Sequence, residues 1–396
     1  MKLSSVLGLL GLASLSSQSH VPRAKRDYVN NDYYVLELSS STSPHEVGRR
    51  LGLVHERELE GLRGHHIFTA PRSEDDIVTP ALKARRRRKR DESGGSDVLD
   101  GVHLSRKQEP RQRLEKRIIP PRPDDLPLKP RLPQSPNAAA VEERSKIMRD
   151  LDIVDPIFKD QWHLFNPVQL GHDVNVTGVW LEGVTGKNVT VAIIDDGLDM
   201  DSNDLKDNYF AEGSYDFNEH DPVPKPTLSD DKHGTRCAGE VAAVRNDVCG
   251  LGVAYDSKVA GIRILSGELT NADEAEALIY KSQLNQIYSC SWGPQDDGRH
   301  MEAPDLIVKR AMLTGIQEGR GGLGSIYVFA SGNGASYGDN CNFDGYTNSI
   351  YSVTVGAVDR AGLHPFYSEH CSANLVVTYS SGSGDNIVSG NCVPGR

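Results

Sequence analysis

From about residue 151 onward, short apolar runs alternate with longer stretches in which apolar residues recur at helical spacing. Short, continuously apolar runs are typical of strands that a sheet buries on both faces. They lie at residues 189–194, 259–265, 287–291, 326–330, 352–357 and 375–378, and the helical stretches lie at 235–244, 272–284 and 304–318. Alternating strands and helices predict an α/β fold, one parallel sheet with right-handed crossovers and helices on both faces. Roughly 240 residues suffice for one such core.

The N-terminal region shows a different pattern. Its first 19 residues hold one lysine, an apolar run and then small residues, which is typical of a secretory signal peptide and too short for a membrane span. Residues 27–80 predict a small α+β unit, with strands at 33–38 and 66–69 and a helix capped by Ser43. His66 is a candidate pH sensor, because histidine titrates in the pH range of the secretory pathway, although a plain surface histidine is the commoner case.

Two basic stretches follow this small unit. The run RRRRKR ends at Arg90, and the pair Lys116-Arg117 stands directly before a proline-rich segment. A basic run is also typical of a nuclear signal or a nucleic-acid patch, but a signal peptide argues against both. Residues 118–136 hold seven prolines in 19 positions, which excludes helix and sheet and predicts an extended linker, with a short helix at 141–148.

Charge and cysteine content narrow the functional classes. Residues 1–117 hold 22 Lys and Arg against 16 Asp and Glu, so they carry +6 and the rest carries −17 of the total of −11. An acidic body suits cationic substrates or metal ions and argues against nucleic acid as a partner. The six cysteines are compatible with disulfides in a secreted protein. Cys237 and Cys290 lie in apolar runs and are predicted to be buried free thiols.

Polar residues with catalytic potential stand at the ends of three predicted elements. The first apolar strand of the body ends in Asp195 and Asp196, whose burial without partners would be unfavourable. His233 stands at the start of a helical stretch in DDKHGTRCAG, and Asn333 follows another strand in ASGNG. The carboxyl ends of parallel strands are where ligands and catalytic groups collect. Each residue alone is also consistent with a turn or a satisfied core side chain.

An aspartate, a histidine and an asparagine in this chain order resemble the subtilisin-like serine proteases. The longer motifs DDG, DDKHGTRCAGE, SCSWGPQDDGRH, ASGNG and DGYTNSIYSV resemble the kexin and furin branch, the proprotein convertases, over residues 155–383. The resemblance implies a subtilisin-like fold and a serine endopeptidase. In such an enzyme His233 is the general base and acid, Asp195 orients it, and Asn333 donates a hydrogen bond to the oxyanion.

The nucleophilic serine of that family is not found in this sequence. Ser383 lies between glycines, but it matches a substrate-binding strand of the family rather than the Gly-Thr-Ser-Ala segment of the nucleophile. The residues from Gly390 to Arg396 do not follow the family pattern, and the β-rich P domain of the family is also missing. The resemblance therefore predicts a catalytic domain that is incomplete at its C-terminus. A chain ending there is expected to fold poorly and to lack proteolysis and self-cleavage.

The resemblance also implies how substrate would be recognised. Lysine and arginine need fixed carboxylates, and guanidinium groups are best matched by planar pairs. Asp296 and Asp344 would face the residue before the cut, Asp196 and Asp230 the preceding one, and Glu274, Glu302 and Tyr346 a residue further upstream. Together these groups predict cleavage after Lys-Arg or Arg-Arg. Arg117 is then the primary self-cleavage site, and Arg90 is a second cut that breaks up the inhibitory propeptide.

Calcium is the implied cofactor, since it takes about six to eight oxygen ligands from carboxylates and carbonyls. One implied site comprises Asp155, Asp204, Val244, Asn246, Asp247, Val248 and Gly250, and a second comprises Asp296, Asp339 and Glu369. Zinc is not expected, because the spacing of His and Cys does not fit a zinc cluster. The resemblance further implies a Cys341–Cys371 disulfide and leaves Cys392 as the partner of Cys249. Asn175 and Asn188 begin glycosylation acceptors, of which Asn175 is preferred.

The sequence thus predicts four segments: a signal peptide at 1–19, a propeptide at 20–117, a proline-rich linker at 118–150 and a subtilisin-like catalytic domain at 151–396. The expected function is that of a calcium-dependent serine endoprotease zymogen of the secretory pathway, in the Golgi. Its expected partners are precursor proteins with dibasic sites and its own propeptide. The alternative is a non-catalytic relative that binds basic peptides or acts as an inhibitor or folding partner. No nucleic acid and no membrane anchor is expected for this chain.

Overall fold

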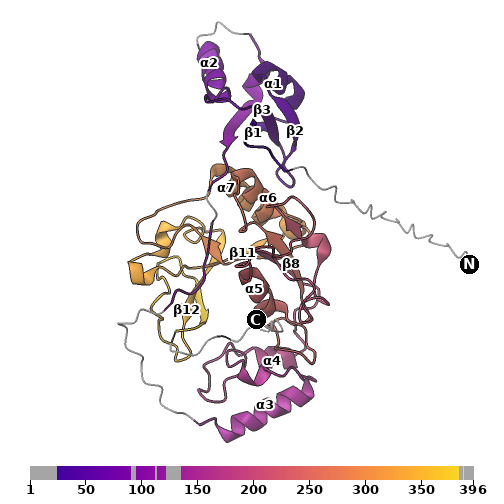
Figure 1. The fold of residues 1–396 in the computed structure, drawn as a ribbon, viewed down its shortest axis with the longest axis vertical. Helices are drawn as coiled ribbons and strands as arrows, with labels where there is room; N and C mark the ends of the chain where they lie inside the picture. Colours follow the sequence, from indigo (N-terminus) through magenta and orange to yellow (C-terminus); the bar gives the residue numbers. More distant parts are fainter. Residues whose placement is uncertain (1–24, 91–94, 112–113, 122–134, 383–386, 388–396) are drawn as a thin grey trace, which may run out of the picture.

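The computed structural model describes residues 25–90, 95–111, 114–121, 135–382 and 387. The predicted signal peptide, most of the proline-rich segment, Ser383 and Cys392 lie outside these residues. The described chain forms a small N-terminal unit and a larger body. Figure 1 shows the small unit resting on α6 (Asn271–Ile279) and α7 (Leu306–Gly322) of the body.

The small unit is a four-stranded antiparallel sheet of order β2-β3-β1-β4 with two helices. Its elements are β1 (Asn31–Leu38), α1 (Pro44–Leu51), β2 (Val54–Glu58), β3 (His65–Pro71), α2 (Val78–Arg90), η1 (Val98–Gly101) and β4 (Val102–Gln108). The side chain of Ser43 caps α1 by accepting from the Glu46 N–H, as the sequence predicts, and Gly52 ends this helix with φ 72°. The sequence did not predict β2, β4 or α2.

The two faces of the small sheet pack against different partners. One face forms a core with α1 and α2, in which Tyr34, Phe68 and Leu82 are buried. The other face packs on the body, where Val35 and Ile67 share a core with residues of α6. The small unit is therefore stabilised on one side by burial against the body.

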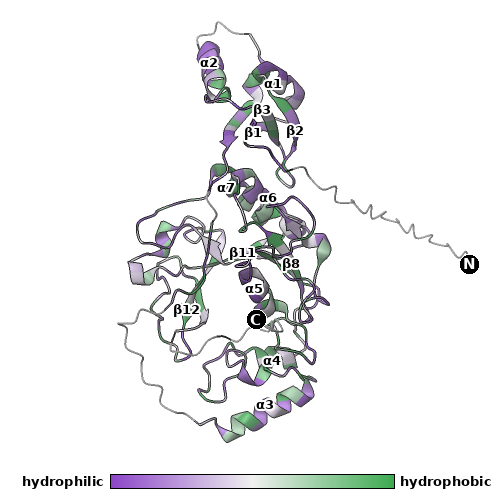
Figure 2. Cartoon of the chain, in the orientation of Figure 1, coloured by the Kyte–Doolittle hydropathy of each residue, from purple (hydrophilic) through white to green (hydrophobic). Residues whose placement is uncertain are grey.

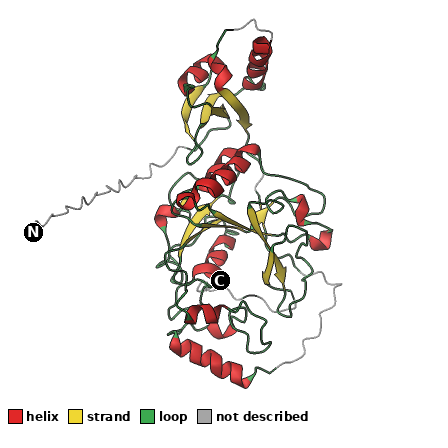
Figure 3. Ribbon diagram, turned by 180° about the vertical axis from the view of Figure 1, so that it is seen from behind, coloured by secondary structure: helices red, strands yellow, loops and turns green. Residues whose placement is uncertain are grey.

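The body contains a seven-stranded sheet in which every strand pairing is parallel. In spatial order the strands are β13 (Val376–Tyr379), β12 (Ser352–Val358), β11 (Ile326–Ala330), β9 (Ile287–Cys290), β6 (Thr190–Asp195), β8 (Lys258–Arg263) and β7 (Tyr215–Asp216). Six of these strands lie at the predicted positions within two residues. Figure 3 shows this sheet in the middle of the body with helices on both sides, the α/β fold that the sequence predicts.

Alternate residues of the central strand β6 point into two cores. Val191 and Ile193 pack with Ala238 of α5 (His233–Ala242). Ala192 and Ile194 face the opposite way, toward the core formed by α6 and α7. In Figure 2, α6 and α7 carry both apolar and polar residues, as expected for helices with one face against a core. Because β6 is covered on both faces, a polar residue can reach solvent or a ligand only from its ends.

Two helices differ from their predicted bounds by more than two residues. α6 ends at Ile279 rather than residue 284, because the chain turns there and Lys281 adopts a φ of 51°. α7 loses helical geometry at Gly319, in agreement with its predicted end at residue 318. α3 (Ala138–Asp150) is longer than predicted and packs on the body through Met148, so the last part of the predicted linker is a docked helix.

The remaining elements are short and lie mostly in the loops of the body. They are β5 (Glu115–Lys116), η2 (Phe158–Asp160), α4 (Val176–Leu181), η3 (Ala211–Gly213), β10 (Trp292–Gly293), η4 (Ala335–Tyr337) and η5 (Cys341–Phe343). Within the described residues, we find no helix with the length and apolar character needed to cross a membrane.

Candidate active site

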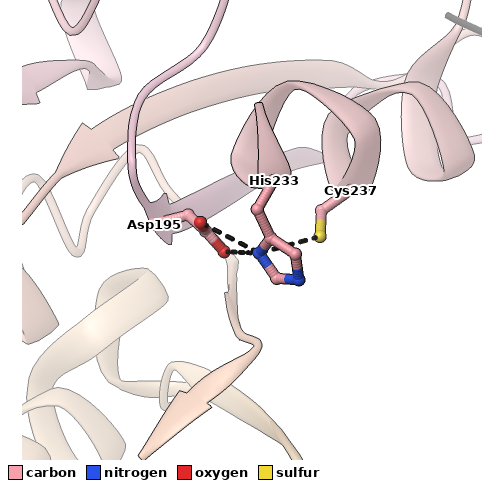
Figure 4. A group of neighbouring side chains, drawn as sticks. All are labelled: Asp195, His233 and Cys237. Carbon is pink, nitrogen blue, oxygen red and sulfur yellow. Dashed lines mark hydrogen bonds and ion pairs between the residues drawn. The ribbon is translucent and has the colours of Figure 1, made fainter. Parts of the chain in front are cut away.

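The end of a central strand and the start of a helix bring an aspartate and a histidine together. β6 ends at Asp195 and α5 begins at His233, whose Nδ1 lies 3.0 and 2.9 Å from the two carboxylate oxygens (Figure 4). The elements approach closely because Gly234 follows the histidine, and a Cβ there would lie 2.4 Å from the Gly197 carbonyl oxygen. Cys237 lies one turn along α5, with Sγ 3.9 Å from the same imidazole nitrogen.

Burial of this pair sets its electrostatics. Burial raises the pKa of Asp195, while the positive charge of a protonated His233 acts in the opposite direction. Burial alone would lower the pKa of His233, but the Asp195 carboxylate raises it well above the ordinary value of 6.5. The carboxylate therefore stabilises the imidazolium ion that forms when the ring accepts a proton at Nε2, the nitrogen turned away from Asp195 in Figure 4.

Asn333 carries a buried hydrogen-bond donor that has no partner among the described residues. It follows β11 between two glycines, and Gly332 adopts a φ of 120°. Its backbone N–H donates to Asp296 Oδ2 at 2.7 Å, which fixes the loop. Its side-chain Nδ2 is buried and makes no hydrogen bond within the described chain. An unmet buried donor is unfavourable, so this amide suits a site that receives a negatively charged oxygen from outside.

The pair Lys116-Arg117 runs through this region as an extended strand. β5 pairs antiparallel with β10, and the Arg117 N–H donates to the Ser291 carbonyl at 2.9 Å. The Lys116 ammonium lies 2.7 Å from Asp196, 3.3 Å from Asp230 and 3.4 Å from Asp231, with 3% of the side chain exposed. These contacts are made by the two predicted carboxylates and by a third one.

Arg117 occupies a second acidic pocket next to the first. Its guanidinium lies 2.5 Å from Asp344 and 3.5 Å from Asp296, and only 2% of the side chain is exposed. It also donates to the Ala330 carbonyl. Gly293 leaves room for it, because a Cβ there would crowd the guanidinium and the Asp344 carboxylate. The structure thus brings together the two carboxylates that were predicted to face the residue before the cut.

The third predicted group contacts Arg111, six positions before Arg117. Arg111 pairs with Glu274 and lies 3.7 Å from Glu302. The Tyr346 hydroxyl donates a hydrogen bond to Glu274. All seven predicted substrate-binding residues therefore lie beside one stretch of this chain, from Arg111 to Arg117.

Asp231 is a member of the lysine pocket that sequence reasoning missed. Its side chain is fully buried and accepts from the Ser266 hydroxyl at 2.8 Å and from Arg263 at 3.2 Å. Arg263 in turn pairs with Asp216 at 2.7 Å. The signal was present in the adjacent aspartates of the DDKHGT motif, but sequence alone does not show that both side chains turn toward one lysine.

Two buried carboxylates with unpaired oxygens form the first predicted cation site. Asp155 Oδ2 and Asp204 Oδ2 are buried and have no hydrogen-bond partner among the described residues. Burial raises the pKa of Asp155 to about 6, and burial together with the charge of Asp155 raises that of Asp204 to about 7. Asn246 bridges the pair, with its backbone N–H 3.2 Å from Asp155 and its side-chain amide 3.3 Å from Asp204. The donor set fits a hard divalent cation such as calcium.

The other residues of the first predicted cation site lie in the loop beside this pair. The N–H groups of Val244 and Gly250 bond to Asp204, and the Val248 N–H donates to Asn246 Oδ1 at 2.8 Å. Asp247 lies near enough to act electrostatically on Asp155. The oxygen of Asn246 is thus engaged within the loop in this structure, and the amide would need to turn to ligate a cation.

The second predicted cation site lies beside the arginine pocket. Oxygen atoms of Asp296, Asp339 and Glu369 lie within 4.8 Å of one another. Burial, reinforced by the charge of Asp296, raises the pKa of Glu369 to about 8. Gly332 is required here as well, because a Cβ would lie 2.3 Å from Glu369. Asp296 is shared between this cluster and Arg117, so the cluster already faces one positive charge.

The cysteines and glycosylation acceptors are placed as follows. The predicted Cys341–Cys371 disulfide is present, with a Cα–Cα distance of 5.5 Å. Cys249 is also disulfide-bonded, and its predicted partner lies outside the described residues. Cys237 and Cys290 are free, the first half-buried and the second buried. The side chains of Asn175 and Asn188 are both exposed, so their modification stays a prediction.

Comparisons with known proteins concern the family and the fold of the chain. The profile of the Subtilase family matches residues 186–390. The chain is 48% identical over 386 residues to Protease KEX1 of Kluyveromyces lactis, which covers 96% of this chain and 46% of that protein. It is 46% identical over 390 residues to Kexin of Saccharomyces cerevisiae, covering 96% and 44% respectively. The chain thus spans about half the length of the curated relatives it matches.

A solved structure supports the fold independently. Fervidolysin from Fervidobacterium pennivorans, a keratinolytic enzyme related to subtilisin, aligns with a TM-score of 0.57 at 18% identity. The alignment covers 90% of this chain and 48% of that one. At this identity the likeness concerns the fold alone.

Proposed function

Because the chain belongs to the subtilase family, and within it to the kexin-like members, we propose that it is a serine endopeptidase zymogen that cuts secretory precursor proteins after paired basic residues. The observation that carries this proposal is the placement of Lys116-Arg117. Both side chains are buried among carboxylates, Lys116 pairs with Trp292 of β10 as a strand, and the Arg117 N–H bonds to the Ser291 carbonyl. A protease binds its substrate in an extended form of this kind, with side-chain pockets that set specificity.

The proposed mechanism assigns one role to each polar group. His233 takes the proton from a serine hydroxyl and later returns it to the leaving amine, while Asp195 holds the ring and stabilises its cation. The unpaired amide of Asn333 receives the oxyanion, and loss of one such donor typically lowers turnover by about 10²–10³. We do not assign any serine of the present sequence as the nucleophile.

The N-terminal region acts as propeptide and inhibitor in this proposal. The small unit packs on α6 and α7. Lys116 and Arg117, the last two residues of the predicted propeptide, occupy the lysine and arginine pockets. Cleavage after Arg117 would leave a product bound in the cleft. Arg90 is the proposed second cut. The signal sequence and the exposed acceptor asparagines support a route through the secretory pathway, with the Golgi as the proposed compartment.

We propose calcium as the structural ion at the site of Asp155 and Asp204. A bound divalent cation would supply the partner that their buried oxygens lack and would lower both pKa values toward the ordinary range. Calcium should raise the thermal unfolding temperature of the wild type above the value measured in chelator. In Asp204→Asn, the temperatures measured in calcium and in chelator should be the same. Asp201→Asn, an exposed carboxylate paired with Lys225, is the matched control. A calcium-dependent shift that survives in Asp204→Asn would contradict this assignment.

The activity is tested on the complete protein expressed from its gene and secreted by a host that lacks dibasic-processing proteases. Fluorogenic peptides ending in Lys-Arg should be cleaved, and His233→Ala should lower kcat by about 10⁶. His300→Ala, in an exposed loop, is the matched control. Peptide binding without turnover would favour the alternative, a non-catalytic relative.

A further inference from the structure

Another basic pair, Lys25-Arg26, directly precedes the small unit. The Arg26 guanidinium lies 2.7 Å from Asp273 of α6, and each of the two side chains is only 7% exposed. The Lys25 ammonium lies 3.1 Å from Glu219, but both of these side chains are more than half exposed. An exposed pair is screened by solvent, so Arg26 is the residue that fixes this segment to the body.

The surroundings of Arg26 form a built site rather than a chance contact. Asp273 stands in the first turn of α6, and its second oxygen accepts from the Thr270 hydroxyl at 2.6 Å. The guanidinium also lies 5.9 Å from the ring centroid of Tyr33 in β1. The arginine thus connects the start of the small sheet to the start of a body helix.

Other contacts show that this side of α6 is a docking surface for the small unit. Arg57 pairs with Glu276 through two contacts of 2.6 and 2.7 Å. The side-chain oxygen of Gln108 accepts from the Ala272 N–H at 2.9 Å. Arg26 therefore stays buried only while the small unit remains docked.

We propose that Lys25-Arg26 is a third processing site, concealed by docking on α6 and cut by the mature enzyme after the small unit separates. The inference rests on the proposed function. Water adds across the Arg26–Asp27 peptide bond, which leaves a carboxylate on Arg26 and an amine on Asp27, and no other reactant is needed. Residues 25–27 form neither helix nor strand in the structure, so the segment can extend into the cleft without unwinding an element.

The cut would make release of the propeptide difficult to reverse. Arg26 leaves with the short N-terminal peptide, and the remaining unit begins at Asp27 without the guanidinium that Asp273 binds. The shortened unit therefore docks on α6 more weakly than the intact one. This is a different consequence from cleavage at Arg90, which divides the unit itself.

The test follows the ends of the propeptide by mass spectrometry in the complete secreted protein. In the wild type, fragments ending at Arg117 should appear first, and fragments beginning at Asp27 should appear later. Asp273→Asn keeps the basic pair and removes its partner, so the Asp27 end should appear at least tenfold faster relative to the Arg117 end. Glu219→Gln, the matched control at the exposed pair, should leave the order and rates unchanged. Arg26→Gln should abolish the Asp27 end alone.

The outcomes separate this inference from the proposed function. Absence of the Arg117 end in the wild type overturns the proposed function. If the Arg117 end forms but the Asp27 end forms in neither the wild type nor Asp273→Asn, the third site does not exist. Equal timing in the wild type and Asp273→Asn shows that docking does not conceal the pair. The Asp27 end must also be missing in His233→Ala, or another protease made the cut.

Discussion

The two basic stretches that the sequence singled out have similar side chains and opposite surroundings. Lys116 and Arg117 lie in an extended segment paired with β10, and their side chains are 3% and 2% exposed among carboxylates. The run ending at Arg90 forms the last turns of α2, where most of its side chains are exposed. Only Arg85 of that run is buried, in an ion pair of 2.7 Å with Asp100.

The difference indicates that a high density of positive charge is not enough to place a basic pair in the acidic pockets. A cleft that binds strands can accept a basic pair only if the backbone is extended and two carboxylate pockets lie at the right spacing. The basic run in α2 does not meet these conditions. Its residues are helical, and the helix packs on the small sheet through Leu82. Accessibility alone would give the wrong order of cuts, since the exposed run is the one expected to be cut second.

The largest expected effect comes from removing the arginine pocket. Asp344→Asn leaves the buried Arg117 guanidinium without its nearest carboxylate, a loss of about 3–5 kcal/mol or roughly 10²–10⁴ in rate. Processing after Arg117 should slow by that factor in pulse-chase experiments. Asp297→Asn, an exposed neighbour paired with His300, should leave it unchanged. Equal slowing in both variants would mean that the pocket does not recognise this arginine.

A second effect of opposite sign is expected in α2. Ala84 is exposed in the helix interior, and Ala84→Pro should destabilise the helix by about 3 kcal/mol. The unwound run would then enter the cleft, so the Arg90 end should form faster while the Arg117 end forms at its usual rate. Ala84→Ser is the matched control with little effect. No gain at Arg90 would show that helical structure does not protect the run.

A smaller gain is expected from loosening the attachment of the C-terminal half of α2. Arg85→Gln removes two hydrogen bonds to Asp100 and one to the Gly95 carbonyl. Because only the attachment of this half is loosened, the rise in Arg90 cleavage should be less than in Ala84→Pro. Arg86→Gln, at an exposed position, serves as the control. A larger rise than in the proline variant would overturn this ranking.

The smallest effect is a dependence on pH. Burial lowers the pKa of His55 and His66 below 6.5, and the two rings lie 3.2 Å apart between their nitrogens. The unfolded small unit therefore binds protons that the folded one resists, so its stability is full above pH 6.5 and declines as pH falls below this value. Trypsin should cut α2 of the His233→Ala zymogen faster on acidification, relative to an unstructured peptide of the same sequence.

Two substitutions test the assignment of this pH effect. His66→Gln should flatten the profile, because the side chain no longer titrates. His103→Gln, on the exposed side of β4, should leave it as in the wild type. An unchanged profile in His66→Gln would assign the pH dependence to other groups.

How far the sequence predicts this molecule depends on the kind of signal. The parallel sheet and the meeting of Asp195 with His233 follow from apolar strands that end in polar motifs, and the structure contains both. α2 was missed because its apolar positions, Val78 and Leu82, are few and the basic residues hide their helical spacing. β2 was missed because its alternating residues are mostly charged, which does not distinguish an edge strand from a loop.

Contacts between distant segments were the least predictable. The third carboxylate of the lysine pocket, Asp231, depends on Arg263 and Ser266 holding it, and neither stands near it in sequence. Arg26 likewise gives no sign in sequence that it meets Asp273, 247 positions later. Such pairs arise where segments far apart in the chain pack together, which no local period encodes.

The segment that carries Arg117 into its pocket belongs to the same polypeptide as the pocket. The first cut is therefore expected to be unimolecular, and its half-time should not change when the protein is diluted. Covalent attachment gives a reacting group a high effective concentration, so even a few molecules in one vesicle would mature at the same pace. Cleavage of other chains is bimolecular and slows on dilution. The cleft would thus first cut its own chain at a rate that does not depend on protein concentration, and only then cut other chains.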